Sequence, residues 1–241
     1  MYFSKKISEF KNVKHCFFSR NGGVSSDIYS NLNCGLGSND KENNVLDNLA
    51  IVSEKIGISK NNLFVMNQTH SNKVVTINEN NRNIQRISSD ALITKINNIA
   101  ISVLTADCVP ILIYEEVNQV IACIHAGWRG AVNGIIKNTL KEIVKMGRNN
   151  KIYVAVGPCI SVKNYEVDKE FYNEFIKENK KNEIFFSQGQ KGKFLFDLRS
   201  YVNLKIKEFD IEHLENIDFD TYSEKENFFS FRRSRHLGEK D

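Results

Sequence analysis

Residues 99–147, IAISVLTADCVPILIYEEVNQVIACIHAGWRGAVNGIIKNTLKEIVKMG, decide the fold. Three apolar runs at 99–104, 109–114 and 120–124 predict β-strands, and Pro110 requires a bend before the second strand returns. After Gly130, apolar residues recur at helical spacing and predict an amphipathic helix from Ala131 that ends at Gly147. Polar residues gather only at the ends of the strands, where a rigid scaffold commonly presents chemistry.

Two of these strand ends carry reactive side chains. Cys108 follows the first run with Asp107 beside it, and His125 ends the third run just before Trp128 and Arg129. A thiol and an imidazole at comparable places support two interpretations, a nucleophilic Cys-His pair or two ligands of a borderline metal ion. Each residue alone is more often an ordinary core side chain, but the pair and its polar neighbours favour a functional site.

His70 supplies a second imidazole. It lies in the segment NQTHS, residues 67–71, between apolar runs at 63–66 and 73–77 that predict strands. A lone histidine in a loop is usually solvated or capping, but here it would complete a set of three ligands. Three protein ligands leave one tetrahedral position open, which is the pattern of a catalytic zinc site. Asp90, at the start of a predicted short strand, is either a partner of such a ligand or a turn residue.

Composition restricts the class of protein. The chain has 241 residues, 41% of them hydrophobic, with two prolines and no linker or repeat, so we expect one domain over residues 1–241. The net charge of +4 arises from scattered Lys and Arg, so neither nucleic acid nor membrane is an expected partner. No segment reaches the roughly 18 apolar residues of a membrane span, and the N-terminus lacks a signal peptide core.

The five cysteines indicate a reducing compartment. They are odd in number and contain no CxxC pair, so they predict neither a disulfide framework nor a zinc ribbon. We therefore expect a cytoplasmic protein.

Segments before the central stretch add one candidate site residue and one helix. Residues 13–19 read as a strand, followed by a turn in which Arg20 faces either solvent or an anionic group. Asn39 or Asp40 is expected to cap a helix that ends at Gly57.

Segments after the central stretch give a strand, two helices and a final strand. Residues 152–156 are expected to form a strand, and Asp168 and Asp197 to cap one helix each. Residues 228–231 read as a last apolar strand, at whose end either Arg232 or Arg233 points inward.

Several catalytic motifs are excluded by the sequence. The GxG at residues 35–37 lacks the third glycine and the βαβ unit of a dinucleotide site. HExxH, GxSxG and P-loop patterns are absent, and no PCxxC follows the HxE at residues 213–215. Five histidines are too few for a four-copper oxidase, although one blue-copper centre with Met66 as axial ligand stays compatible with the ligand types.

Five motifs together resemble the laccase-domain (YfiH-like) family, whose members are described as polyphenol oxidases or as purine nucleoside phosphorylases. They are NQTHS at 67–71, TADCVPIL at 105–112, HAGWRG at 125–130, GPCI at 157–160 and SFRR at 230–233. The resemblance begins near RNGGVS at residues 20–25 and so covers nearly the whole chain. The family continues past SFRR with a Thr-Gly-Arg segment and a strand, whereas residues 234–241 read SRHLGEKD.

The resemblance implies a fold, a metal and a reaction. It implies an α/β (α+β) layered sandwich with mixed sheets flanked by helices, similar to certain toxin deamidases, and one zinc held by His70, Cys108 and His125. It also implies phosphorolysis of adenosine, inosine, guanosine and methylthioadenosine, together with adenosine deamination. The expected small-molecule partners are therefore purine nucleosides and phosphate, and the sequence predicts no oligomeric state.

Roles for individual residues follow as hypotheses. Asp107, Cys108 and His125 are the expected catalytic residues, with Asp107 orienting a ligand or carrying a proton. Phosphate needs a cationic pocket, for which Arg20, Arg129 and Arg232 are the candidates, and Asn33 and Gln68 are candidate contacts to base or ribose.

Three alternatives stay open from the sequence. The first is a metal-free amide hydrolase with Cys108 as nucleophile and His125 as base. The second is a copper-dependent polyphenol oxidase, for which copper is the less favoured metal. The third is an interaction protein without catalytic activity.

Overall fold

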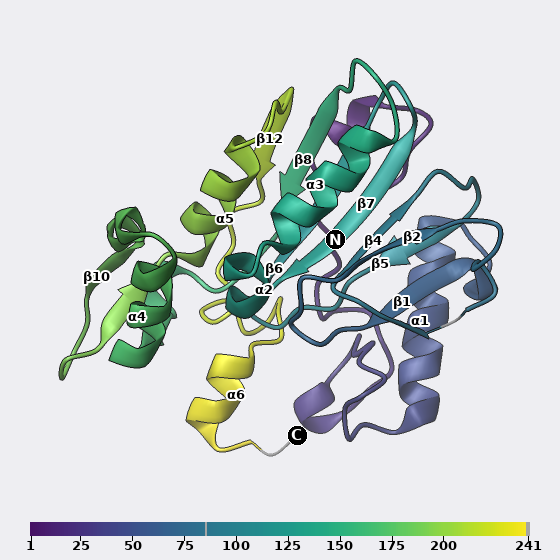
Figure 1. Ribbon diagram of the computed structural model, residues 1–241. Coiled ribbons are helices and arrows are strands. Elements are labelled where there is room, and N and C mark those ends of the chain that lie inside the picture. The colour runs from purple at the N-terminus through teal and green to yellow at the C-terminus, as the bar shows by residue number, and fades with distance from the viewer. Residues whose placement is uncertain (85, 240–241) are drawn as a thin grey trace.

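The structure, a computed structural model, describes residues 1–84 and 86–239. It is a mixed α/β fold in which sheets are flanked by helices, as expected (Figure 1). The largest sheet has the strand order β12-β8-β6-β7-β4-β2. These six strands are β2 (Val74–Ile77), β4 (Ala91–Thr94), β6 (Val109–Glu115), β7 (Val120–Ala126), β8 (Ile152–Val156) and β12 (His213–Asn216).

The centre of this sheet is the β6–β7 hairpin predicted from the sequence. β7 pairs antiparallel with both β6 and β4, and β6 pairs antiparallel with β8, while the two outer strands pair in parallel. Pro110 lies second in β6 opposite His125, and its carbonyl accepts a hydrogen bond from Gly157 N at 2.8 Å. A proline is tolerated here because it lies at the start of the strand.

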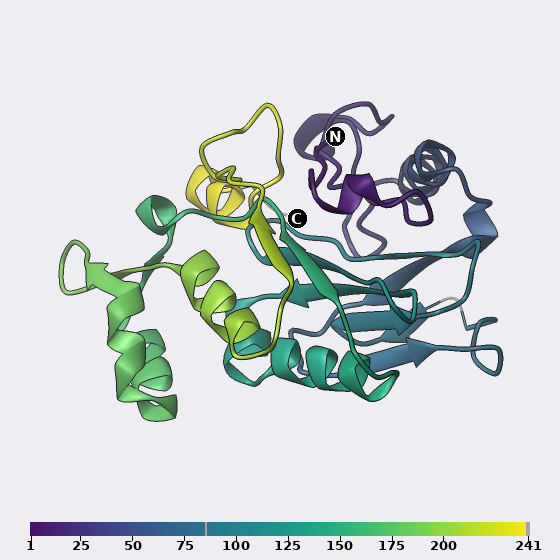
Figure 2. The same cartoon turned by 90° about the horizontal axis from the view of Figure 1, so that it is seen from above.

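Helices cover one face of the sheet and the N-terminal third of the chain covers the other (Figure 2). The covering helices are α3 (Ile135–Lys145) and α5 (Leu198–Lys207), and α1 (Glu42–Ile56) lies on the N-terminal side. Because alternate strand residues point to opposite faces, the side chains of Ile111, Ile113 and Ile124 join the core under α3. The positions between them face the N-terminal segment.

Two small sheets flank the large one. The parallel sheet β3-β1-β5 consists of β1 (Leu63–Asn67), β3 (Arg86–Ser88) and β5 (Ala100–Ser102). The antiparallel sheet β10-β11-β9 consists of β9 (Glu166–Val167), β10 (Phe186–Gln188) and β11 (Phe194–Phe196). With α4 (Lys169–Glu178) it forms the projecting green lobe of Figure 1, which is packed with Phe side chains.

The central helix is interrupted, contrary to the continuous helix expected from Ala131 to Gly147. α2 (Trp128–Val132) ends before Gly134, whose φ of 89° is left-handed, and α3 then begins at Ile135 and ends at Lys145. Glycine adopts this conformation without the steric cost that a Cβ imposes, so it allows the chain to change direction. Trp128 and Arg129 consequently lie within a helix and not in a loop.

Two predicted strands are wrong. Residues 13–19 contribute only a bridge between Tyr2 and Phe17, because this segment crosses the sheet face and joins no edge. The apolar run at 228–231 leads into the helix α6 (Phe231–Leu237), since the Ser230 side chain caps it by accepting from Arg233 N. A serine at this position provides the N-cap that an apolar run alone cannot reveal.

Helix capping was predicted correctly in two cases of three. The Asp168 side chain accepts from Phe171 N at the start of α4, and Asp197 accepts from Ser200 N at the start of α5. α1 ends at Gly57 as expected, but its N-cap residue is Lys41, which makes no capping hydrogen bond through its side chain. Asp40 instead accepts hydrogen bonds from Ser25 and Asn33.

Within the part of the chain that the structure describes, no helix combines the length and the apolar character that spanning a bilayer demands.

Candidate metal centre

His70, Cys108 and His125 converge although they are far apart along the chain. They come from the loop after β1, the loop before β6 and the end of β7, respectively. One donor atom from each lies within 4.8 Å of the other two, and Cys108 Sγ is 3.8 Å from His70 Nε2. A single point therefore lies within about 2.8 Å of all three donors, close to zinc bond lengths of about 2.0 to 2.3 Å.

Asp90 orients the buried ligand. Its Oδ1 lies 2.8 Å from His125 Nδ1, which leaves Nε2 of the imidazole as the donor atom. Carboxylates hold metal-binding histidines in this way in known metal sites. The His70 and His125 rings are nearly perpendicular, with centroids 4.7 Å apart.

The same carboxylate also shapes the loop that carries His70. It accepts hydrogen bonds from the backbone N–H groups of Thr69, His70 and Ser71 and from the Ser71 hydroxyl. These bonds hold His70 at a φ of 56°, a conformation that non-glycine residues rarely adopt. Burial alone would raise the pKa of Asp90, but the hydrogen bonds from His125 and Ser71 lower it far below its usual value, so the carboxylate stays ionised.

Gly127 allows the ligands to approach. A Cβ at this position would lie 2.7 Å from His70 Cδ2 and 3.0 Å from Cys108 Sγ. Any side chain here would push two of the three ligands apart, because both contacts are shorter than van der Waals separation allows. The glycine in HAGWRG is therefore a requirement of the cluster.

Asp107 positions the Cys108 loop against the C-terminal segment. Its Oδ1 accepts from the Thr221 hydroxyl and its Oδ2 from Arg232 N, both at 2.7 Å. Asp107 has a φ of 91°, so these two bonds hold a rarely populated backbone conformation directly before Cys108. Its role as an orienting residue fits this geometry, while its role as a proton carrier stays a prediction.

Two of the three predicted arginines lie near the cluster. Arg129 is exposed and stacks on Trp128 at 4.5 Å. Burial and the neighbouring His125 lower the pKa of His70, and the charge of Arg129 lowers it further. Arg232 lies over the Tyr165 ring at 5.2 Å, and its Nη1 donates to the Glu166 carbonyl at 2.7 Å.

The other three predicted substrate contacts bond to their own surroundings. Arg20 donates to the carbonyls of Ser30 and Lys225 and stacks on Phe229. Gln68 exchanges two hydrogen bonds with the backbone of Leu104, and Asn33 bonds within its own loop to Gly35, Ser38 and Asp40. Their side-chain polar groups thus hold loops in place, and substrate contact by them stays a prediction.

Tyr165 is a candidate site residue that the sequence reasoning missed. Burial raises the pKa of its phenol, Cys108 and Asp107 raise it further, and Arg232 and Arg129 act in the opposite direction. The tyrosine therefore lies among the residues of the site as a neutral hydrogen-bonding group. Its sequence context, NYEV, carries no signal that distinguishes it from a core aromatic.

The Cys108 thiol is protonated at neutral pH in the protein alone. Burial raises its pKa to about 12, and the neighbouring Asp107 charge adds to the effect. A nucleophilic cysteine requires a depressed pKa, whereas a metal ion displaces the thiol proton on binding. The thiol therefore suits a metal ligand better than a free nucleophile.

Comparison with known proteins gives concordant matches over most of the chain. A family model described as multi-copper polyphenol oxidoreductase laccase matches residues 14–240. A Rickettsia conorii protein named purine nucleoside phosphorylase is 36% identical over 204 residues, covering 83% of this chain and 84% of the relative. A Haemophilus influenzae protein of the same name is 30% identical over 230 residues, covering 95% of this chain and 92% of the relative.

Solved structures show the same fold. A Neisseria meningitidis protein superposes with a TM-score of 0.79 at 30% identity, covering 89% of this chain and 86% of the other. The Bacillus licheniformis hypothetical protein YfiH gives a TM-score of 0.84 at 25% identity, covering 90% of this chain and 86% of the other.

Proposed function

This chain belongs to the multi-copper polyphenol oxidoreductase laccase family, and from that membership we propose that it is a zinc-dependent purine nucleoside phosphorylase. The observation that carries the proposal is the convergence of His70, Cys108 and His125. The names of its relatives support the reaction, and the donor set supports the metal.

Two imidazoles and one thiolate suit zinc. Zinc accepts nitrogen and sulfur donors in tetrahedral geometry, and three protein ligands leave a position for a reacting group. A multi-copper mechanism requires several copper sites, and among the described residues these three form the only group of metal-binding side chains. Bound zinc would act as a Lewis acid towards an oxygen of the substrate or of water.

The chain's own residues would hold the other reactant. Phosphate attack at C1′ of the ribose forms a C–O bond, breaks the glycosidic bond and releases the purine with the bonding electrons. An exposed guanidinium is the strongest anion-binding group available, so we assign Arg129 to the phosphate. Arg232 and Tyr165 would orient the nucleoside, and Asp107 would keep the Cys108 loop and Arg232 in register.

The proposal includes the substrates and a second reaction. We assign adenosine, inosine, guanosine and methylthioadenosine as substrates. At the same centre we assign a deamination, in which water attacks C6 of adenosine, the C6–N bond breaks, and ammonia and inosine are released. We also assign the protein to the cytoplasm, because its five free thiols persist in a reducing compartment.

Product identification tests this proposal. Zinc-loaded protein is incubated with each nucleoside, with and without phosphate. We expect free base and the sugar 1-phosphate only when phosphate is present, the sugar being methylthioribose for methylthioadenosine and ribose for the other three. We also expect inosine from adenosine in either case. Release of no base from any of the four nucleosides in the presence of phosphate would rule out the phosphorylase.

Variants separate the metal enzyme from the alternatives. Cys108→Ala is expected to lose both bound zinc and turnover, while Cys34→Ala, which removes another half-buried thiol, keeps both. Hydrolysis of an amide that persists after chelation of the metal, but is lost in Cys108→Ala, would establish the amide hydrolase mechanism instead. Stoichiometric copper together with oxidation of a phenol would establish the oxidase.

A further inference from the structure

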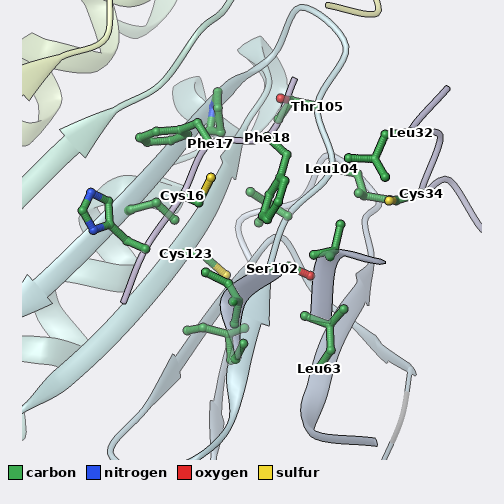
Figure 3. Close-up of a pocket in the computed structure, with 18 of the residues that line it drawn as sticks. Cys16, Phe17, Phe18, Leu32, Cys34, Leu63, Ser102, Leu104, Thr105 and Cys123 are labelled. Atoms are coloured by element: carbon green, nitrogen blue, oxygen red, sulfur yellow. The ribbon is translucent and has the colours of Figure 1, made fainter. Parts of the chain in front are cut away.

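A large cavity lies between the N-terminal segment and the face of the main sheet. Its volume is about 1120 Å³, and His70 is one of the residues that line it. Figure 3 shows its lining, to which Cys16 and Phe18 contribute from the N-terminal segment and Cys123 from β7. The reaction proposed above uses none of these three residues.

The floor of the cavity lies on the sheet face that carries a metal ligand. Ile121, Cys123 and His125 alternate along β7 and therefore point to the same face. Ile121 is the only residue of β7 that is not fully buried, and Leu112 is the only such residue of β6. Both side chains line the cavity, which leaves them partly exposed. Packed side chains cover the other residues of the two strands.

Several polar groups that line the cavity beside Leu112 and Cys123 are already bonded or uncharged. The Ser102 hydroxyl already donates to the Phe64 carbonyl at 3.0 Å. Burial raises the pKa of the Cys16 thiol to about 11 and that of Cys34 to about 12, so both thiols are uncharged at neutral pH. A purine nucleoside, which carries many donors and acceptors, would lose hydrogen bonds here, whereas an apolar body would not.

The boundary of the cavity is cationic. Six Lys or Arg side chains line it against two carboxylates, those of Asp27 and Glu239. Lys11, Lys14 and Lys95 are exposed, and among the described residues none of the three forms a salt bridge. Lys14 Nζ lies beside Gly57 at the end of α1, and Lys11 belongs to the N-terminal segment that lines the cavity. Lys95 Nζ instead donates to the Met146 carbonyl at 2.8 Å, at the end of α3.

We propose that this cavity is a second ligand site, which binds an amphiphilic monocarboxylate with an unbranched apolar chain. The apolar chain lies over Leu112, Ile121 and Cys123, and the carboxylate faces Lys11 and Lys14. The segment from Ile121 to His125 spans about 13 Å at the strand rise of about 3.3 Å per residue. A chain of about twelve carbons therefore fits along it.

Calorimetric titration with three ligands of equal chain length tests both parts of the proposal. Zinc-loaded protein is titrated with dodecanoate, 1-dodecanol and dodecyltrimethylammonium below their aggregation concentrations. We expect one dodecanoate per chain, bound at least tenfold more tightly than the cation and more weakly as salt rises. Absence of binding, or equal binding of anion and cation, would overturn the proposal.

Variants locate the ligand. Ile121→Trp fills the cavity and is expected to weaken dodecanoate binding at least tenfold while zinc content stays unchanged. Lys11→Glu and Lys14→Glu are expected to weaken it, whereas Lys137→Glu, on the exposed side of α3, is the matched control and leaves it unchanged.

Removal of zinc decides whether the ligand binds at the metal. Dodecanoate affinity is expected to be the same in Cys108→Ala, which lacks a metal ligand but keeps the cavity. Loss of binding in that variant would place the carboxylate on the metal and overturn the proposal. Because nucleoside turnover is not measured in these titrations, their outcome is independent of the proposed phosphorylase activity.

Discussion

Gly127 shows how a single residue without a side chain determines a site. A Cβ at this position would meet His70 and Cys108, and its neighbour Ala126 ends the strand that delivers His125. The conformation of Gly127 is ordinary for any residue, with a φ of −70°. The requirement for glycine is therefore one of space and not of backbone geometry.

Substitution of this glycine is expected to weaken metal binding. Gly127→Ala places a methyl group 2.7 Å from His70 Cδ2, so the imidazole must move, and zinc affinity should fall about 10- to 100-fold. Competition with a chromophoric chelator measures the affinity. Gly37→Ala is the control, because a Cβ there meets nothing within 4 Å. Equal zinc affinity in both variants would show that His70 is not a ligand.

At the level of elements, the helices differ in how they begin. α4 and α5 start with aspartates whose side chains accept a backbone N–H, whereas the N-cap residue of α1, Lys41, makes no such bond. α1 is nevertheless ordered by packing, since Val45 and Leu49 are buried and Asn48 bonds to the loop carbonyls of Asn31 and Asn33. Tertiary contacts here compensate for a missing cap.

Substitution of the N-cap residue is expected to destabilise α4 and α5 more than α1. Asp168→Ala and Asp197→Ala should each lower the free energy of unfolding by about 1 kcal/mol, because each leaves a backbone N–H without its acceptor. Lys41→Ala removes no capping bond and should change it by less than about 0.5 kcal/mol. Urea unfolding followed by circular dichroism measures all three. A loss in Lys41→Ala as large as in the aspartate variants would contradict this account.

At the scale of the whole molecule, hydrogen-bonded carboxylates tie distant segments together. Glu215 on β12 accepts from the Ser4 hydroxyl and from the backbone of Lys5 and Lys6, which fixes the N-terminus to the edge of the main sheet. Burial opposes ionisation of Glu215, but these hydrogen bonds outweigh it and lower its pKa. In Asp220 and Glu178 the balance of burial and hydrogen bonding is the same, and both pKa values are lowered.

Stability is therefore expected to fall with acid. A carboxyl whose pKa is lower in the folded state stabilises it above the unfolded pKa of about 4 to 4.5, and this contribution is lost as pH falls further. Burial also lowers the pKa of His15, whose contribution is lost as pH falls below about 6.5. The free energy of unfolding should decline modestly below pH 6.5 and steeply below about pH 4.5. Urea unfolding with chelator present, at pH 7, 5.5, 4 and 3, measures it.

The same urea unfolding experiments test whether the chain forms one domain. Glu215→Gln should lower the free energy of unfolding by about 1 kcal/mol at pH 7 and reduce its pH dependence, while exposed Glu170→Gln changes neither. One domain over residues 1–241 predicts that fluorescence of Trp128 and circular dichroism report coincident transitions. Two separate transitions would instead divide the chain, and a flat pH profile would contradict the role of the carboxylates.

Local sequence determined the elements whose signals are local. The β6–β7 hairpin follows from two apolar runs joined by a polar turn, and the Asp168 and Asp197 caps follow from the preference of aspartate for the position before a helix. The three candidate ligands were recognisable because each stands where an apolar run stops. Residues 228–231 were misassigned because a four-residue apolar run is too short to distinguish the period of a strand from that of a helix. The Ser230 side chain caps the helix α6 that begins there.

Only the tertiary structure decided which of these residues meet. Asp90 and His125 are 35 positions apart, and Asp107 and Arg232 are 125 apart, so their hydrogen bonds depend on strand register and on loop packing that no local pattern encodes. For the same reason no local pattern indicated that Arg20, Asn33 and Gln68 hold loops in place, or that Arg232 lies over Tyr165. Periodicity and turn chemistry act over a few residues, whereas a site is an arrangement of segments that only the packed core brings together.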